Sequence, residues 1–203
     1  MMKPPAYTKI QNPFLNPPSY IVYNDVRFLI IDTPSISNMS RYIKEFERWN
    51  VTDVVRCCKA TYSQAVLNDR GIKVHDWIFS DGDPPSKSII DGWLNLVNLT
   101  FKHDDDLMLY NEGEKDTKTD GEEDQNIKKK PCIAAHCVAG LGSTDAGCRA
   151  PVLVAIALIE EGMDPLDSVA FVRKHRQGAI NKRQLKYLES YKRRTNQASC
   201  IIS

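Results

Sequence analysis

The hydrophobic residues of this chain follow two kinds of spacing. Short, mainly β-branched runs predict buried strands. They cover residues 22–32, 51–56, 72–76 and 132–135. Apolar residues that recur three or four positions apart predict amphipathic helices. These segments are residues 39–46, 86–101, 151–161, 165–175 and 181–193. Strands that alternate with helices predict an α/β domain with helices around a central, mostly parallel sheet.

Three segments fall outside this pattern. Residues 1–19 are proline-rich, so we expect a flexible arm before a domain that spans residues 20–194. Residues 103–126 are almost wholly polar, which predicts a disordered surface insertion. Residues 195–203 are expected to form a tail.

Length and charge narrow the class of protein. A chain of 203 residues is the size of one domain with room for tails. Its formal net charge of +1 gives no indication of a nucleic-acid partner. The charges are unevenly distributed along the chain. Residues 103–126 hold ten acidic residues and two lysines, a net charge of −8. The rest of the chain therefore carries +9, which indicates a basic body with an acidic insertion.

The cysteines and the apolar runs indicate the cellular compartment in which we expect the protein. The chain opens without an apolar signal stretch, and its longest apolar run, residues 150–159, is about half of a membrane span. Its six cysteines lack the dense pattern of a secreted scaffold. We therefore expect reduced cysteines in the cytosol, as buried residues, ligands, nucleophiles or lipidation sites.

The segment IAAHCVAGLG, residues 133–142, is the strongest indication of chemistry. An apolar strand leads into Cys137 and a glycine-bearing turn, and a helix then starts near Arg149. Such a turn presents backbone N–H groups to phosphate, and a thiolate at its base can attack phosphorus. The loop residues expected to bind phosphate are Val138, Ala139, Gly140, Leu141 and Gly142. The alternatives are a structural thiol or, less favoured, a zinc site made from Cys132, His136, Cys137 and Cys148.

A second loop, DWIFSDGDPP at residues 76–85, follows the predicted strand 72–76. Phosphoryl transfer to a cysteine needs an acid that protonates the leaving oxygen, and Asp81 can supply it. An ordinary turn would have the same composition.

These segments, with VRCCKATY and the terminal CIIS, resemble the phosphatases of regenerating liver. That family consists of small prenylated members of the Cys-based tyrosine and dual-specificity phosphatase superfamily. The resemblance covers about residues 20–102 and 131–203. It implies the compact phosphatase fold, a phosphoprotein substrate, a phosphocysteine intermediate, and neither metal nor other cofactor. It also implies binding to cyclin-M magnesium transporters and, as in some relatives, a homo-oligomer.

The resemblance assigns roles to individual residues. Cys137 matches the nucleophile, and Asp81 matches the general acid. Cys58 matches a cysteine that forms a reversible disulfide with the nucleophile and protects it from irreversible oxidation. Ala150 stands where most members of the superfamily carry Ser or Thr, which implies slow turnover.

The chain departs from the superfamily in the phosphate loop. The signature places the phosphate-binding arginine six residues after the cysteine, where this chain has Ser143. Arg149 stands twelve residues on, and removal of residues 143–148 restores CVAGLGRAPV. The insertion either loops out and leaves Arg149 in place, or destroys phosphate binding, or reflects an alternative transcript or a gene-model error. Displaced donors cost several kcal/mol of transition-state stabilisation, so we expect weak or absent activity.

The C-terminus fits a prenylation signal. Cys200 is followed by two aliphatic residues and a final serine, which favours farnesylation. Residues 182–194 hold six basic residues and one acidic residue, and they would add attraction to anionic lipid. We therefore expect the protein at the cytoplasmic face of the plasma membrane and endosomes, with a cytoplasmic pool.

Overall fold

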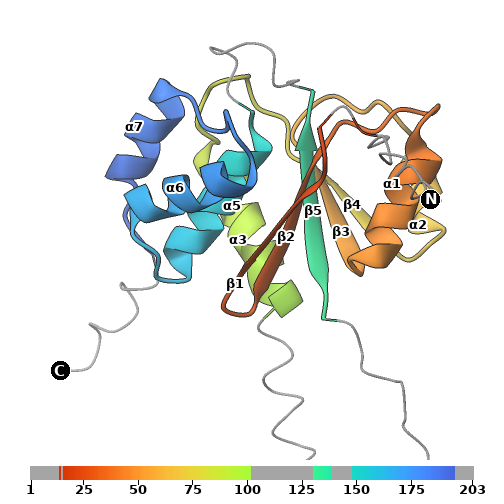
Figure 1. The fold of residues 1–203 in the computed structure, drawn as a ribbon, viewed down its shortest axis with the longest axis horizontal. Helices are drawn as coiled ribbons and strands as arrows, with labels where there is room; N and C mark the ends of the chain where they lie inside the picture. Colours follow the sequence, from red (N-terminus) through yellow and green to blue (C-terminus); the bar gives the residue numbers. More distant parts are fainter. Residues whose placement is uncertain (1–13, 15, 102–129, 139–147, 195–203) are drawn as a thin grey trace, which may run out of the picture.

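A five-stranded sheet forms the centre of the computed structural model, which describes residues 14, 16–101, 130–138 and 148–194 (Figure 1). Its strands lie in the order β1 (Ser19–Tyr23), β2 (Val26–Asp32), β5 (Cys132–Cys137), β3 (Val51–Arg56) and β4 (Lys73–Asp76). β1 pairs with β2 in an antiparallel manner, and the other pairs are parallel. The predicted α/β class with a mostly parallel sheet is confirmed.

Helices cover both faces of the sheet. One face carries α1 (Met39–Arg48) and α2 (Ala65–Asn68) (Figure 1). The other carries α3 (Lys87–Phe101), α5 (Ala150–Glu160), α6 (Pro165–His175) and α7 (Lys182–Ser190). α2 was not predicted, because four residues are too few to show a helical period. α7 ends three residues before its predicted limit of 193, where Tyr191 takes up an extended backbone conformation.

The central elements β5 and α5 are apolar on all sides because they are enclosed on all sides. Every residue of both is buried. α5 therefore lacks the polar stripe of a surface helix. It ends where Gly162 adopts a positive φ of 102°, as the sequence predicts. Within the described residues, no helix is both long enough and apolar enough to cross a bilayer.

The last described residues are held against the C-terminal end of α5. Glu160, at this end of the helix, accepts hydrogen bonds from the Tyr191 hydroxyl at 2.7 Å and from the Arg194 backbone N–H at 3.0 Å. The guanidinium of Arg194 also pairs with Asp91 of α3. The last described residues therefore lie at this end of α5.

The opposite end of α5 lies at the edge of the sheet where the parallel strands finish. β2, β5, β3 and β4 all end there, because parallel strands run in the same direction. In open α/β sheets, ligands bind beyond the carboxyl ends of the strands. Asn16 reaches this edge by donating to the Asp32 carboxylate at 3.0 Å, and Arg176 pairs with the same group at 2.6 Å.

Candidate active site

Cys137 is the last residue of β5 and is almost fully buried, with 2% of its surface exposed. Thr33 donates to its carbonyl oxygen at 2.6 Å and fixes the end of the strand. The backbone N–H of Arg149 donates to Cys137 Sγ at 3.3 Å. Arg149 is the N-cap residue of α5, so the sulfur lies at the positive end of a helix. The hydrogen bond from the Arg149 N–H and the positive end of the helix both favour a negative charge on the Cys137 sulfur.

Arg149 is thus adjacent to Cys137 in space although twelve residues separate them in sequence. Of the predicted phosphate-loop residues, Val138 is described and 57% exposed. The other four, Ala139, Gly140, Leu141 and Gly142, lie outside the described residues, as do residues 143–147 of the insertion.

The Arg149 guanidinium connects the nucleophile to the loop that carries Asp81. Nη1 donates to the Phe79 carbonyl at 2.6 Å, and Nη2 pairs with the Asp81 carboxylate at 2.8 Å. The remaining donor, Nε, is buried and has no hydrogen-bond partner among the described residues. The three residues predicted for catalysis are therefore brought together, and the Nε–H of the arginine has no partner among the described residues.

Two residues at the start of α7, which the sequence reasoning missed, tie these parts to each other. Asn181 lies within 3.4 Å of the Gly82 carbonyl, to which it donates through Nδ2. Gln184 donates through Nε2 to the Cys148 carbonyl at 3.4 Å. Their reciprocal capping box was visible in the sequence as an Asn-x-x-Gln spacing before an amphipathic run.

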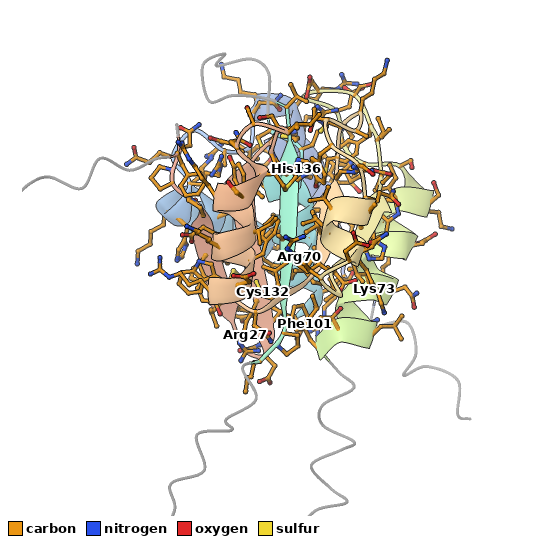
Figure 2. The ribbon with its side chains drawn as sticks, turned by 90° about the vertical axis from the view of Figure 1, so that its right-hand side faces the viewer. Arg27, Arg70, Lys73, Phe101, Cys132 and His136 are labelled. Atoms are coloured by element: carbon orange, nitrogen blue, oxygen red, sulfur yellow. The ribbon has the colours of Figure 1, made fainter. Side chains whose placement is uncertain are left out.

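The opposite face of β5 carries a closed polar network around His136, labelled near the end of the strand in Figure 2. Its Nε2 hydrogen-bonds the Tyr62 hydroxyl at 2.9 Å. Arg56 donates to Asp76 through Nε and Nη2 at 2.6 and 2.7 Å, and to the Tyr62 carbonyl through Nη1. Burial, with the neighbouring Arg56, lowers the pKa of His136 to about 3, so this imidazole is neutral at physiological pH.

Further cysteines lie near Cys137. Cys58 is buried, with Sγ 4.0 Å from His136 Nδ1, and burial raises its pKa. Cys148 was named in the sequence only as an unlikely zinc ligand, yet its Sγ lies 2.8 Å from Cys137 Sγ. No cluster of three His, Cys, Asp or Glu residues able to hold a metal occurs within the described ranges. Cys200 lies outside them.

This chain is similar in sequence to known protein tyrosine phosphatases. The protein tyrosine phosphatase PRL-1 of Leishmania major is 39% identical over 186 residues, which cover 91% of each chain. The mouse protein tyrosine phosphatase type IVA 2 is 39% identical over 91% of this chain and 96% of its own. A probable type IVA phosphatase of Dictyostelium discoideum is 38% identical over 96% and 99%. No protein-family model matches the chain.

A solved structure of a protein tyrosine phosphatase has the same fold. A putative protein tyrosine phosphatase from Leishmania major superposes with a TM-score of 0.68 at 37% identity, over 87% of this chain and 99% of that one. The fold is that of a Cys-based protein tyrosine phosphatase. Within that class, the chain belongs to the type IVA, or PRL, family, as the sequence resemblance predicted.

Proposed function

We propose that this protein tyrosine phosphatase acts through Cys137 as nucleophile, Arg149 as phosphate-binding residue and Asp81 as general acid. The observation that carries the proposal is the position of Arg149. Its backbone N–H contacts the Cys137 sulfur, its side chain reaches the Asp81 loop, and its Nε has no partner among the described residues. A guanidinium binds phosphate through two parallel N–H groups, and the buried Nε–H of Arg149 has no other partner among the described residues.

The reaction runs in two steps. The Cys137 thiolate attacks phosphorus while Asp81 gives a proton to the leaving oxygen, which forms a phosphocysteine. Water then attacks the phosphorus while Asp81 accepts its proton. The P–S bond breaks, and inorganic phosphate and the Cys137 thiolate are released. In the free protein Asp81 is paired with Arg149. An incoming phosphate competes with Asp81 for that arginine.

Turnover is proposed to be slow. The six inserted residues, 143–148, enter the loop whose N–H groups would hold the transferring phosphoryl group. A less preorganised loop stabilises the transition state less, even with Arg149 beside Cys137. Ala150, fully buried at the start of α5, also offers no hydroxyl to assist the second step.

A comparison of the full chain with a variant lacking residues 143–148 tests this proposal. Binding of orthovanadate and turnover of a phosphotyrosine peptide are measured for both. We expect the deletion to raise affinity and turnover, and Cys137→Ser to abolish turnover in either background. Equal values with and without the insertion would refute the impairment. Turnover that survives Cys137→Ser would refute the assigned nucleophile.

We further propose that farnesylation of Cys200 tethers the enzyme to the cytoplasmic face of the plasma membrane and endosomes. The adjoining basic residues, 182–194, provide the second, electrostatic contact with anionic lipid. Flotation of the prenylated chain with vesicles that contain or lack phosphatidylserine tests both parts. Cys200→Ser should abolish flotation, and removal of the anionic lipid should weaken it. Flotation that is unchanged by Cys200→Ser would refute the tether.

One observation supports a second function, a scaffold that binds cyclin-M magnesium transporters. Ile36, Ile78 and Val138 are 85%, 54% and 57% exposed and follow β2, β4 and β5 at the catalytic edge. Exposed apolar residues around a site are typical of a protein-binding surface. An acidic loop of the partner would then enter the phosphate site. An acidic peptide that fails to compete with orthovanadate would count against this second function.

A further inference from the structure

The sulfur atoms of Cys137 and Cys148 lie 2.8 Å apart, which is closer than the ordinary van der Waals contact of two sulfur atoms. Both residues are buried, with 2% and 5% of their surfaces exposed. The hydrogen bond to Cys137 and burial raise the pKa of Cys148 well above its usual range.

Three contacts of the described residues hold this pair in place. Gln184, itself buried, donates to the Cys148 carbonyl at 3.4 Å. The next N–H along the chain, that of Arg149, donates to Cys137 Sγ at 3.3 Å. Thr33 fixes the Cys137 carbonyl. The two sulfurs therefore approach each other from backbones that are each anchored to a neighbouring element.

We propose that Cys148 is the resolving cysteine of this phosphatase and forms a reversible disulfide with Cys137 when a hydroperoxide oxidises the nucleophile. Cys148 belongs to the inserted residues 143–148, so the insertion brings its own partner for the nucleophile. The Cys58–Cys137 disulfide implied by the family resemblance is then the lesser product, because Cys148 Sγ is in contact with Cys137 Sγ at 2.8 Å, whereas Cys58 Sγ contacts His136 Nδ1 at 4.0 Å.

The chemistry balances with one equivalent of hydroperoxide. The Cys137 thiolate attacks the peroxide oxygen, the O–O bond breaks, and after uptake of a proton the products are a sulfenic acid and water. Cys148 then attacks the sulfenic sulfur. An S–S bond forms, the S–O bond breaks, and the Cys148 proton leaves with the hydroxyl as water. An external thiol returns two electrons and restores both thiols.

Peptide mapping of the oxidised full chain separates the candidate pairs. Trypsin should release residues 130–149 as one peptide with Cys132, Cys137 and Cys148, and residues 57–59 as another with Cys57 and Cys58. A Cys137–Cys148 bond lowers the mass of peptide 130–149 by two hydrogen atoms. Cleavage before Asp145 then leaves its two halves linked. A bond to Cys57 or Cys58 joins the two tryptic peptides instead.

After treatment with hydrogen peroxide, we expect the internal bond within peptide 130–149 to outnumber every link to Cys57 or Cys58. The bond should persist in Cys58→Ser and in the matched control Cys132→Ser, and it should disappear in Cys148→Ser. A dominant link to Cys57 or Cys58 would overturn the proposal. So would sulfinic or sulfonic Cys137 without a disulfide, or loss of the bond in Cys58→Ser. The experiment measures peptide masses, so its result does not depend on whether the proposed catalytic roles are correct.

Discussion

His136 and Cys137 are neighbours at the end of β5, but the two faces of the sheet provide them with opposite surroundings. On the His136 face, Arg56 uses Nε, Nη1 and Nη2 on Asp76 and Tyr62. On the Cys137 face, Arg149 keeps a buried Nε without a partner among the described residues. A network in which each nitrogen of a buried arginine has a partner holds a structure together, whereas a buried donor without a partner is a candidate for receiving a ligand.

The largest effect should follow from opening the closed network. Arg56→Met removes three hydrogen bonds and leaves Asp76, which is partly exposed, without its cation. We expect the free energy of unfolding, measured in urea, to fall by about 3 kcal/mol. Arg70→Met serves as the control, because Arg70 is exposed and should lose less than about 0.5 kcal/mol. Equal losses would mean that the Arg56 network does not support the fold.

The second-largest effect is expected at Arg149, on the face of β5 that carries Cys137. Arg149→Lys keeps the charge but loses the planar fork that binds two phosphate oxygens. We expect the dissociation constant for orthovanadate to rise by about a hundredfold, or about 2.7 kcal/mol. Arg48→Lys, at an exposed position, is the control. Orthovanadate is titrated into the full chain and into the variant without residues 143–148, each with and without the Arg149→Lys substitution. An unchanged constant would remove Arg149 from the site.

The neutral His136 makes the closed face sensitive to acid. In the unfolded chain this histidine has its ordinary pKa of 6.5, but in the folded protein the pKa is lowered to about 3. Between these values the unfolded state binds more protons, so stability is full above pH 6.5 and is lost as pH falls. Between pH 7 and pH 5 this one group should cost about 2 kcal/mol.

Urea unfolding at several pH values measures this dependence. His136→Asn lacks the titrating group and should show a flatter curve over the same range. Parallel curves for the two proteins would contradict the prediction.

The smallest effect should come from removal of a single hydroxyl group. Tyr62→Phe leaves Nε2 of the buried His136 without the partner at 2.9 Å. We expect a loss of about 1.5 kcal/mol in the free energy of unfolding. Affinity for orthovanadate should change much less than in Arg149→Lys, because Tyr62 lies on the other face of β5. A larger loss of affinity than of stability would show that the two faces are coupled.

The sequence predicted the sheet, most helices and three members of the site, because each has a local signature. Cys137 follows an apolar strand and precedes glycines, and Asp81 stands in an Asp-Gly-Pro loop. The contact between Arg149 and Cys137 could not be predicted, since the inserted residues left three outcomes open. Only the folded positions of β5 and α5 show that the two residues meet.

Other features lacked any local signal. The pairing of Tyr62 with His136 joins positions 74 residues apart. The contact of Cys148 with the nucleophile depends on where the inserted residues return to the helix. Periodicity reports which face of an element is buried, but it does not report which polar atoms meet across two elements.

The attachment of Tyr191 and Arg194 to Glu160 would set an orientation for the molecule if Cys200 carries the proposed lipid. α5 is 11 residues long, so its two ends lie about 16 Å apart, with Cys137 at one end and the anchored Tyr191 and Arg194 at the other. Cys200 is six residues beyond Arg194, a reach of at most about 20 Å. A lipid on Cys200 would hold the far pole of the domain toward the bilayer. The catalytic edge would then face the cytosol, toward targets that stand well clear of the membrane surface.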